Sequence, residues 1–213
     1  MNEVIILFEG YSNDLGNGKL DANCSCTLIK GLKNVIVDTM TAWDRQKLID
    51  ALKSHYISPE DINYVVCTHS HADHIGNNNL FTNADQHIIG SCIQNRTRFH
   101  ELIQNQTIVL CDGIVISTTP GHTYDDVTVH VDTKVDDKKA RIAITGDLFE
   151  NELDIFNPLI WKKLGRPELV KTQAKNRLAV ITWADYIVPG HGPMFKVTDQ
   201  IRQLLSDQIN EFQ

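Results

Sequence analysis

The segment from residue 64 to residue 74 constrains the fold of this chain more than any other. Its first part, Tyr64–Cys67, has the apolar composition of a buried strand, and histidines and an aspartate follow it at once. Because residues two apart on an extended chain point the same way, His69 and His71 can face one cation. Asp73 and His74 come where the chain can turn into a helix, which would direct them toward a second cation. The segment therefore predicts a strand end that carries a metal-binding loop.

Candidate ligands also lie farther along the chain. His122 and His191 each follow a Pro-Gly pair that ends an apolar stretch, and such a turn presents a side chain from rigid backbone. Asp147 follows an apolar run and Gly146, and a carboxylate at a strand end can bridge two cations. Imidazole and carboxylate ligands suit zinc, and iron or manganese also accept them. We therefore expect two metal ions per chain, held by His69, His71, Asp73, His74, His122, Asp147 and His191.

Any one of these histidines, taken alone, is better explained as a surface residue or a hydrogen-bonded core residue. Their combination is not, because an Asp-His pair, two Pro-Gly-His turns and a Gly-Asp strand end accompany the first two histidines. The remaining four histidines lack such surroundings, and we leave them outside the site: His55, His87, His100 and His130.

Strands dominate the predicted secondary structure. Apolar, β-rich stretches lie at Val4–Phe8, Cys24–Ile29, Val35–Val37, Ile62–Cys67, Ile108–Leu110, Ile114–Ser117, Val127–Val131 and Ile142–Thr145. Turn residues separate them at Asn13-Asp14, Gly16-Asn17-Gly18 and Asp136-Asp137. Helical spacing predicts helices at Trp43–His55 and Glu168–Trp183 and from about Thr198. This mixture predicts an α/β (α+β) chain of layered sheets covered by helices, forming a single domain over residues 1–213.

The charge balance argues against indiscriminate binding to nucleic acid. The net charge is −7, so phosphate backbones and anionic membranes would repel the chain on average. Two short basic clusters, Lys138-Lys139-Ala140-Arg141 and Trp161-Lys162-Lys163, are the candidates for a local exception. Short runs of this kind are more often solvated turns.

The N-terminal segment and the cysteines predict a cytosolic protein. The apolar run after Met1 has no basic region before it and is too short for a signal sequence or a membrane span. The five cysteines are too scattered for a disulfide framework, which favours a reducing compartment. Cys24 and Cys26 would share one strand face and pack there, since no second cysteine pair completes a zinc site.

The run Thr68-His69-Ser70-His71-Ala72-Asp73-His74, with a later histidine, aspartate and histidine in the same order, resembles the signature of the metallo-β-lactamase superfamily. The resemblance implies a four-layer αββα sandwich with the metals at one edge between the sheets. It also implies that His69, His71 and His122 hold one metal, that Asp73, His74 and His191 hold the other, and that Asp147 bridges them. Asp73 would accept a proton from the attacking water, and Asp38 would orient a ligand histidine.

Further motifs resemble a narrower branch of this superfamily, namely Phe8–Tyr11, Val37–Thr39 with Trp43, His74–Asn77 before Leu80-Phe81, Gly146–Glu150 and Val188–Phe195. That branch implies a zinc-dependent endoribonuclease that acts on the 3′ end of histone pre-mRNA, is cytosolic and nuclear, and is often a homodimer. The chain departs from the superfamily at Met40, where glycine usually follows the Asp-Thr pair, so the loop at Asp38 is expected to differ in shape. The residues that bind substrate stay undetermined.

Two alternative functions remain open at this stage. A glyoxalase II-like enzyme would hydrolyse thioesters, esters or lactones with the same ligand run, although that branch carries a C-terminal extension and the chain continues only from His191 to Gln213. A binding protein that has lost its chemistry is the other alternative. The complete ligand set argues against it, because a decaying site is expected to lose ligands.

Overall fold

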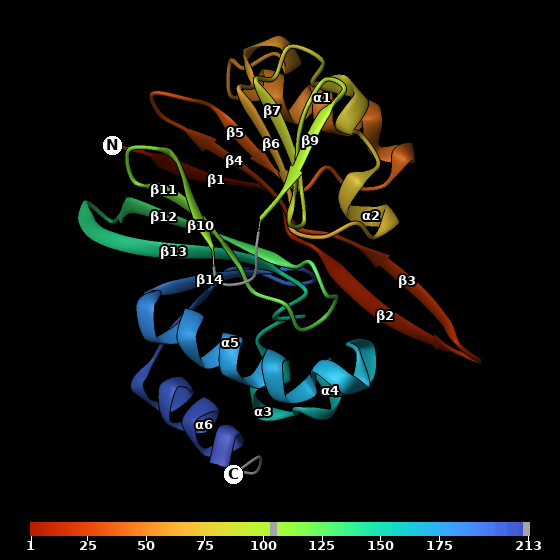
Figure 1. The fold of residues 1–213 in the computed structure, drawn as a ribbon, viewed down its shortest axis with the longest axis vertical. Coiled ribbons are helices and arrows are strands. Elements are labelled where there is room, and N and C mark those ends of the chain that lie inside the picture. The colour runs from red at the N-terminus through yellow and green to blue at the C-terminus, as the bar shows by residue number, and fades with distance from the viewer. Residues whose placement is uncertain (103–105, 211–213) are drawn as a thin grey trace.

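The computed structural model describes residues 1–102 and 106–210. Two β-sheets pack face to face in the middle of the molecule (Figure 1). The first sheet has the order β1-β4-β5-β6-β7-β8-β9, with β5, β6 and β7 parallel and the other neighbours antiparallel. Its strands are β1 (Glu3–Phe8), β4 (Cys26–Lys30), β5 (Val35–Val37), β6 (Tyr64–Cys67), β7 (Gln86–Ile89), β8 (Cys92–Asn95) and β9 (Arg98–Glu101).

The second sheet has the order β10-β11-β12-β13-β14-β15, and within it β13 and β14 run parallel. Its strands are β10 (Thr107–Cys111), β11 (Ile114–Thr118), β12 (Val127–Val135), β13 (Lys138–Gly146), β14 (Tyr186–Pro189) and β15 (Phe195–Lys196). Branched aliphatic side chains from both sheets, such as Val66, Ile88, Val129 and Ile144, form the core between them. This packing of two apolar faces holds the sheets together.

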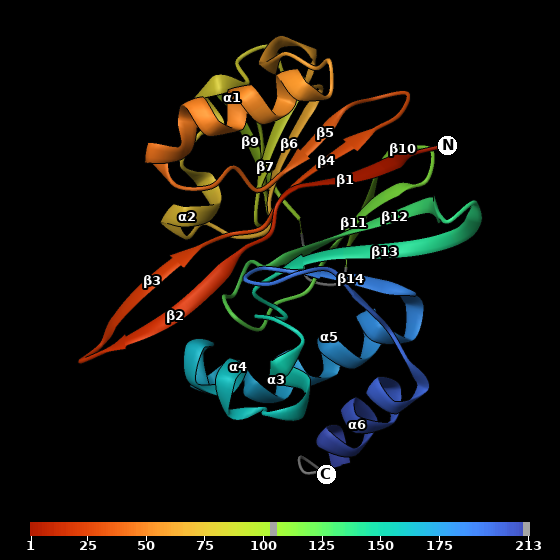
Figure 2. The ribbon, with the colours of Figure 1, turned by 180° about the vertical axis from the view of Figure 1, so that it is seen from behind.

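Helices cover the outer face of each sheet (Figures 1 and 2). Leu48 and Leu52 of α1 (Arg45–Ser54) pack on the first sheet, near the short α2 (Ala72–Ile75). The second sheet is covered mainly by α5 (Val170–Trp183) and α6 (Asp199–Asn210), with α3 (Leu153–Phe156) and α4 (Leu159–Leu164) beside them. Single 3-10 turns lie at Ala42–Asp44, Pro59–Asp61, Asn78–Leu80 and Pro167–Leu169. The four-layer αββα arrangement predicted from the sequence is confirmed.

A long hairpin, β2 (Tyr11–Gly16) with β3 (Lys19–Asn23), extends away from both sheets (Figures 1 and 2). The prediction of a turn at Asn13-Asp14 is wrong, because both residues pair with β3. The actual turn is at Gly16–Gly18, where Gly16, Asn17 and Gly18 all have positive φ. The hairpin was missed because its side chains are mostly exposed and polar, so main-chain pairing rather than apolar alternation forms it.

Other differences from the sequence-based elements concern their limits. The expected strand at Cys24–Ile29 begins at Cys26, and the expected strand at Ile62–Cys67 begins at Tyr64. The strands β7, β8 and β9 were not predicted, because they are four residues long and β9 is exposed throughout. The hairpin β12–β13 runs farther than its apolar residues suggested, up to the turn at Asp136 and Asp137, which both have positive φ. Such a turn matches the twist of paired strands.

Candidate metal centre

The first group of candidate ligands lies just beyond β6. Asp38, which follows β5, accepts a hydrogen bond from the Thr68 main-chain N–H at 2.7 Å and fixes the direction of the chain there. His71 keeps extended backbone before α2 begins at Ala72, so Asp73 and His74 face the site from a helical turn. His69 and His74 are buried, whereas the His71 side chain is exposed. The predicted strand end with a metal-binding loop is therefore built as a strand followed by a short helix.

The other candidate ligands come from the second sheet. Because β13 and β14 are parallel, their carboxyl ends meet at one edge and place Asp147 beside His191. Glycine is required at this edge: Gly146 has a φ of +51°, and a Cβ on Gly190 would lie 1.9 Å from Asp147 Oδ1. His122 comes from the loop between β11 and β12, which the Thr119 N–H closes by donating to the Asp126 carbonyl.

The seven side chains converge as two triplets around one carboxylate. In the first triplet (His69, His71, His122), His71 Nδ1 lies 2.9 Å from His69 Nε2 and 3.1 Å from His122 Nε2. In the second triplet (Asp73, His74, His191), Asp73 Oδ2 lies 3.8 Å from both His74 Nε2 and His191 Nε2. Each triplet therefore directs its donor atoms at a single point.

Asp147 lies between the two triplets. Its Oδ2 is 3.4 Å from His122 Nε2 and 3.6 Å from His69 Nε2, both in the first triplet. The same oxygen is 3.3 Å from His191 Nε2, and Oδ1 is 3.3 Å from His74 Nε2, both in the second. A single carboxylate thus faces the donor atoms of both triplets.

These distances fit the size of a metal ion. Ligand atoms about 2.0–2.1 Å from a tetrahedral zinc ion lie about 3.3–3.4 Å from each other, which is close to most of the spacings above. In addition, His74 Nε2 and Asp147 Oδ1 are buried and face each other at 3.3 Å without forming a hydrogen bond, although buried polar atoms are normally satisfied. The donor set and its unsatisfied atoms could therefore hold metal ions.

A further group of metal-compatible atoms, formed by Cys24, Asp38 and His74, lies behind the second triplet. Burial raises the pKa of the Cys24 thiol well above its usual range, so the thiol stays protonated. His74 Nδ1 in this group lies 3.0 Å from Asp38 Oδ2, which already engages it. The packing role expected for Cys24 and Cys26 agrees with their complete burial.

The two triplets differ electrostatically. In the first, burial lowers the pKa of His69 well below its usual range and lowers the pKa of His122 to about 4, so both imidazoles are neutral. In the second, burial alone would lower the pKa of His191, but Asp147 outweighs it and raises that pKa to about 9. Burial is likewise outweighed at His74, where Asp38 and Asp147 hold the pKa well above its usual range. Protons at the second triplet thus occupy the place of a cation, which must displace them on binding.

The loop at Asp38 shows what the departure at Met40 means. Met40 has a φ of +60°, the left-handed region in which glycine is least strained, and its side chain is buried in the core beneath α1. The methionine therefore keeps the backbone shape that glycine would give. Asp38 in consequence still reaches both Thr68 and His74.

One residue at the site was not assigned a role from the sequence. Glu150 is buried, its Oε1 lies 3.5 Å from His122 Nδ1, and neither of these two atoms has a hydrogen-bond partner. Burial, with a smaller contribution from Asp147, raises the pKa of the Glu150 carboxyl well above its usual range. A glutamate three residues after Asp147, in an otherwise apolar Leu-Phe context, was the available signal.

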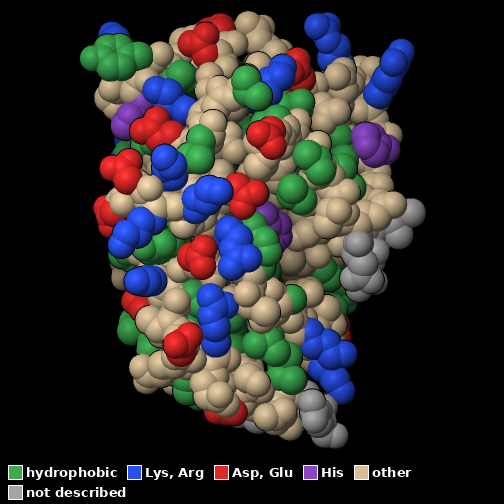
Figure 3. All heavy atoms as spheres, turned by 90° about the vertical axis from the view of Figure 1, so that its left-hand side faces the viewer, with side chains coloured by type: hydrophobic (Ala, Val, Ile, Leu, Met, Phe, Trp, Pro, Cys, Tyr) green, Lys and Arg blue, Asp and Glu red, His purple; other side chains and the backbone are tan. Residues whose placement is uncertain are grey.

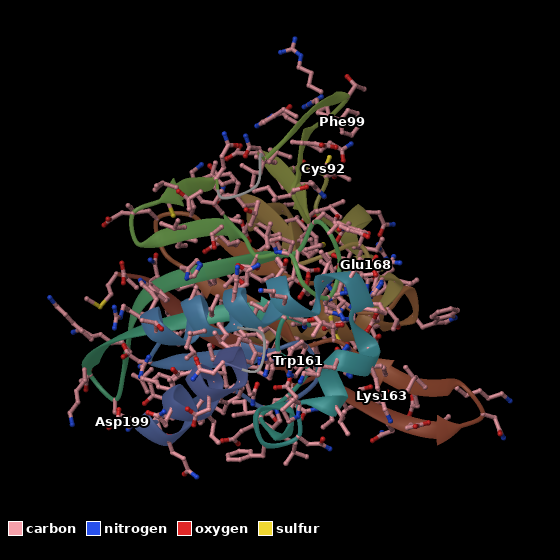
Figure 4. The ribbon with its side chains drawn as sticks, turned by 60° about the horizontal axis from the view of Figure 1, so that its bottom comes forward. Cys92, Phe99, Trp161, Lys163, Glu168 and Asp199 are labelled. Atoms are coloured by element: carbon pink, nitrogen blue, oxygen red, sulfur yellow. The ribbon has the colours of Figure 1, made fainter. Side chains whose placement is uncertain are left out.

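A groove lies between the β2–β3 hairpin and helices α3 and α4, beside Glu150 and Asn151. It has a volume of about 420 Å³, and its walls are mainly apolar, with Leu20, Leu159 and Leu164 among them. Lys163 lines the same groove, and in Figure 4 it lies at the end of α4 nearest the hairpin. Next along the chain, the guanidinium of Arg166 lies over the ring of the exposed Tyr124.

The other basic cluster, at Lys138, Lys139 and Arg141, is far from the site. It lies at the start of β13, while Asp147 follows the other end of this nine-residue strand. Nine residues of strand span roughly 25–30 Å. Arg141 is also paired with Asp185, and on the side of the molecule opposite the β2–β3 hairpin basic and acidic side chains alternate (Figure 3). Of the two basic clusters, only Lys162-Lys163 is placed near the candidate ligands.

The sequence profile of the metallo-beta-lactamase superfamily matches residues 21–191. The chain belongs to this superfamily. Its members are metal-dependent hydrolases, and this chain is a hydrolase of that class. Among the residues that the structure describes, no helix is long and apolar enough to cross a membrane.

Individual relatives place the chain more closely. It is 36% identical to metallo-beta-lactamase domain-containing protein 1 of Xenopus laevis, over 92% of this chain and 82% of that protein. This confirms the narrower resemblance noted in the sequence. The chain is also 28% identical to an N-acyl homoserine lactonase of a Bacillus species, over 55% of this chain and 52% of that protein.

Solved structures share the fold at lower identity. A metallo-beta-lactamase-like protein of Thermotoga maritima superposes with a TM-score of 0.67 at 21% identity, covering 92% of this chain and 99% of that one. The metallo-beta-lactamase FIM-1 of Pseudomonas aeruginosa, solved in a mono-zinc form, superposes with a TM-score of 0.64 at 20% identity, covering 95% and 90%.

Proposed function

We propose that the two triplets and Asp147 hold two zinc ions and that the chain hydrolyses phosphodiester bonds in RNA. The observation that carries the metal site is the Asp147 carboxylate, which faces donor atoms of both triplets at 3.3–3.6 Å. Nitrogen and oxygen donors favour zinc, and the related fold of FIM-1 was solved with zinc. Iron or manganese remains the alternative in the same donor set.

Two such ions, when bound, supply hydroxide near neutral pH and polarise the oxygen that gains charge during hydrolysis. Residues of the chain orient the ligand rings and accept a proton. Asp38 fixes the ring of His74 through Nδ1, and the carbonyls of Tyr11 and Asn23, each 3.1 Å from His191 Nδ1, fix His191. Both rings thereby present Nε2 to the site. Asp73 has a side chain 23% exposed, so its carboxylate can meet solvent and accept a proton from an attacking water.

RNA as substrate is supported by the narrow family resemblance and by the groups beside the site. Lys163 and Arg166 supply positive charge, and the exposed Tyr124 ring supplies a surface on which a base can stack. In a homodimer, the basic residues of two chains would together form a longer surface for RNA. We further propose a cytosolic location with a nuclear fraction, as RNA processing requires.

The second candidate function is hydrolysis of a small ester, thioester or lactone. The specific observation in its favour is the apolar groove beside Glu150, which has room for an acyl chain. The relative named N-acyl homoserine lactonase supports the same function.

The deciding experiment compares substrates on one zinc-loaded preparation. A labelled RNA stem-loop, an acyl-glutathione and an N-acyl homoserine lactone are each incubated with the protein and with Asp147→Asn as the inactive control. Cleavage of the stem-loop at a defined position, abolished in the control, is the expected result. Turnover of the lactone or the thioester with intact RNA would replace the RNA proposal by the second candidate. No turnover of any of the three, with fewer than two metals per chain, would overturn both.

A further inference from the structure

Each ligand histidine of the site needs its second ring nitrogen held, because that contact fixes the tautomer and the ring orientation. His74 is held by Asp38, His191 by two main-chain carbonyls, and His69 by the Thr68 hydroxyl 3.2 Å from its Nδ1. In His71 it is Nδ1 itself that faces the other ligands. Among the described ligand histidines, the buried ring nitrogen that points away from the other ligands and has no hydrogen-bond partner is His122 Nδ1.

Glu150 faces that nitrogen. Its Oε1 lies 3.5 Å from His122 Nδ1, somewhat longer than the 2.7–3.2 Å of an N–H···O hydrogen bond, and both atoms are buried. Two buried polar atoms that face each other without partners are each costly unless they pair. Such contacts are often long before a site is loaded and shorten afterward. A small rotation of either side chain would satisfy both atoms.

A carboxylate oxygen of Glu150 also lies within 4.8 Å of donor atoms of Asp147 and His191, so a supporting role has to be distinguished from a ligand role. The Glu150 carboxylate lies on the Nδ1 side of the His122 ring, whereas His122 Nε2 faces Asp147 Oδ2 at 3.4 Å. The main chain of Glu150 is fixed on both sides. Its N–H donates to Asp154 Oδ2 at 2.8 Å, and its carbonyl accepts from the His191 N–H at 2.7 Å.

The support behind this loop is itself rigid. Asp154 is paired with the fully buried Arg177, and Arg177 also donates to the Leu148 carbonyl at 2.7 Å. The loop from Asp147 to Asp154 therefore carries the bridging carboxylate and the Glu150 side chain as one unit. The Glu150 side chain faces His122 of the first triplet, and the Glu150 carbonyl accepts a hydrogen bond from His191 of the second triplet.

We propose that Glu150 is a positioning residue that accepts a hydrogen bond from His122 Nδ1 and so directs His122 Nε2 at the metal held by the first triplet. This inference rests on the proposed metal site. It predicts that removing the acceptor weakens metal binding at the first triplet and leaves the second triplet as it was.

The test compares Glu150→Leu, which removes the acceptor, with Glu150→Gln, which keeps an acceptor oxygen. Glu152→Gln changes an exposed glutamate of the same loop and serves as the matched control. Zinc binding is titrated in competition with a chromophoric chelator. Glu150→Leu is expected to lower the affinity for one of the two ions by about 10- to 100-fold, while Glu150→Gln retains most of it.

A second readout reports the hydrogen bond directly. In ¹H–¹⁵N spectra of the zinc-loaded protein, the His122 Nδ1 proton is expected to be observable in the unchanged protein and in Glu150→Gln, and to exchange away in Glu150→Leu. Unaltered binding of both ions by Glu150→Leu, an equal loss in Glu150→Gln, or a His122 ring with no Nδ1 proton would each overturn the inference. If the unchanged protein binds fewer than two ions, the proposed metal site itself fails, which is a different result.

Discussion

The two ligand triplets meet at one carboxylate but are built differently. The second triplet is held from behind by a buried aspartate and by main-chain carbonyls of the β2–β3 region, so its rings cannot turn without disturbing the core. The first triplet includes the exposed His71 and depends on Glu150 for His122. The second triplet also carries protons that the first does not. The difference indicates that the protein alone holds the second triplet in place, whereas the first triplet is completed only when its metal binds.

The largest effect is expected where the two triplets share a ligand. Asp147→Asn keeps the side-chain shape but removes the charge that faces donors of both triplets. Both metals should dissociate together and hydrolysis should fall by at least about 10³-fold, since several kcal/mol of stabilisation are removed. Elemental analysis and initial rates measure this. Release of a single ion would show that the two sites do not depend on a common carboxylate.

The next effect separates the triplets by pH in protein stripped of metal with a chelator. The raised pKa of His191, about 9, stabilises the fold below about pH 6.5, and that contribution is lost as the pH rises to 9. The lowered pKa of His122, about 4, acts oppositely: its contribution is full above about pH 6.5 and is lost as the pH falls to 4. The contribution of each of these two histidines amounts to about 3 kcal/mol.

Denaturant unfolding across this pH range measures both contributions. His191→Gln should reduce only the loss of stability at alkaline pH, and His122→Gln only the loss at acidic pH, while His74 and His69 keep their own contributions. Zinc-loaded protein should show a smaller loss at alkaline pH, because the metal has already displaced the proton. An alkaline loss of stability as large in His191→Gln as in the unchanged protein would show that His191 does not carry a raised pKa.

A smaller effect tests how each triplet is supported. Asp38→Asn retains a side chain that tolerates the positive φ of this position but weakens the contact to His74 Nδ1. Affinity for one ion should fall by about 10- to 100-fold. His71→Ala should remove the other ion, and because His71 is exposed, the free energy of unfolding should barely change. Zinc binding of both variants is measured by competition with a chelator. If both variants lost the same ion, the assignment of His74 and His71 to different metals would be wrong.

The smallest expected effect concerns the surface beside the centre. Lys162→Ala with Lys163→Ala should weaken RNA binding and reduce the salt slope by about 0.7 for each phosphate that the lysines no longer neutralise. Lys138→Ala with Lys139→Ala is the matched control, because that pair lies at the opposite end of β13. Binding measured across a salt series that is equal in both double variants would exclude the α4 lysines as RNA-binding residues.

The sequence was informative wherever a residue's role is set by its immediate neighbours. The run from His69 to His74 follows a buried strand, and the glycines before Asp147 and His191 make room at a crowded edge, so these positions could be predicted from local pattern. The limits of β12 and β13 could not, because pairing between the two strands extends them beyond their apolar residues. The hairpin β2–β3 was missed for the same reason, since its exposed polar side chains carry no periodic signal.

What the sequence by itself determined is the set of chemical groups: imidazoles and carboxylates in an order and spacing that suit a pair of cations. The tertiary structure decided how they meet. Only the parallel pairing of β13 with β14 places Asp147 beside His191, and only the packing of the two sheets brings both to the end of β6. Glu150 gains its place in the same way, since a contact between residues 28 positions apart, His122 and Glu150, depends on how strands are ordered in a sheet rather than on any local pattern.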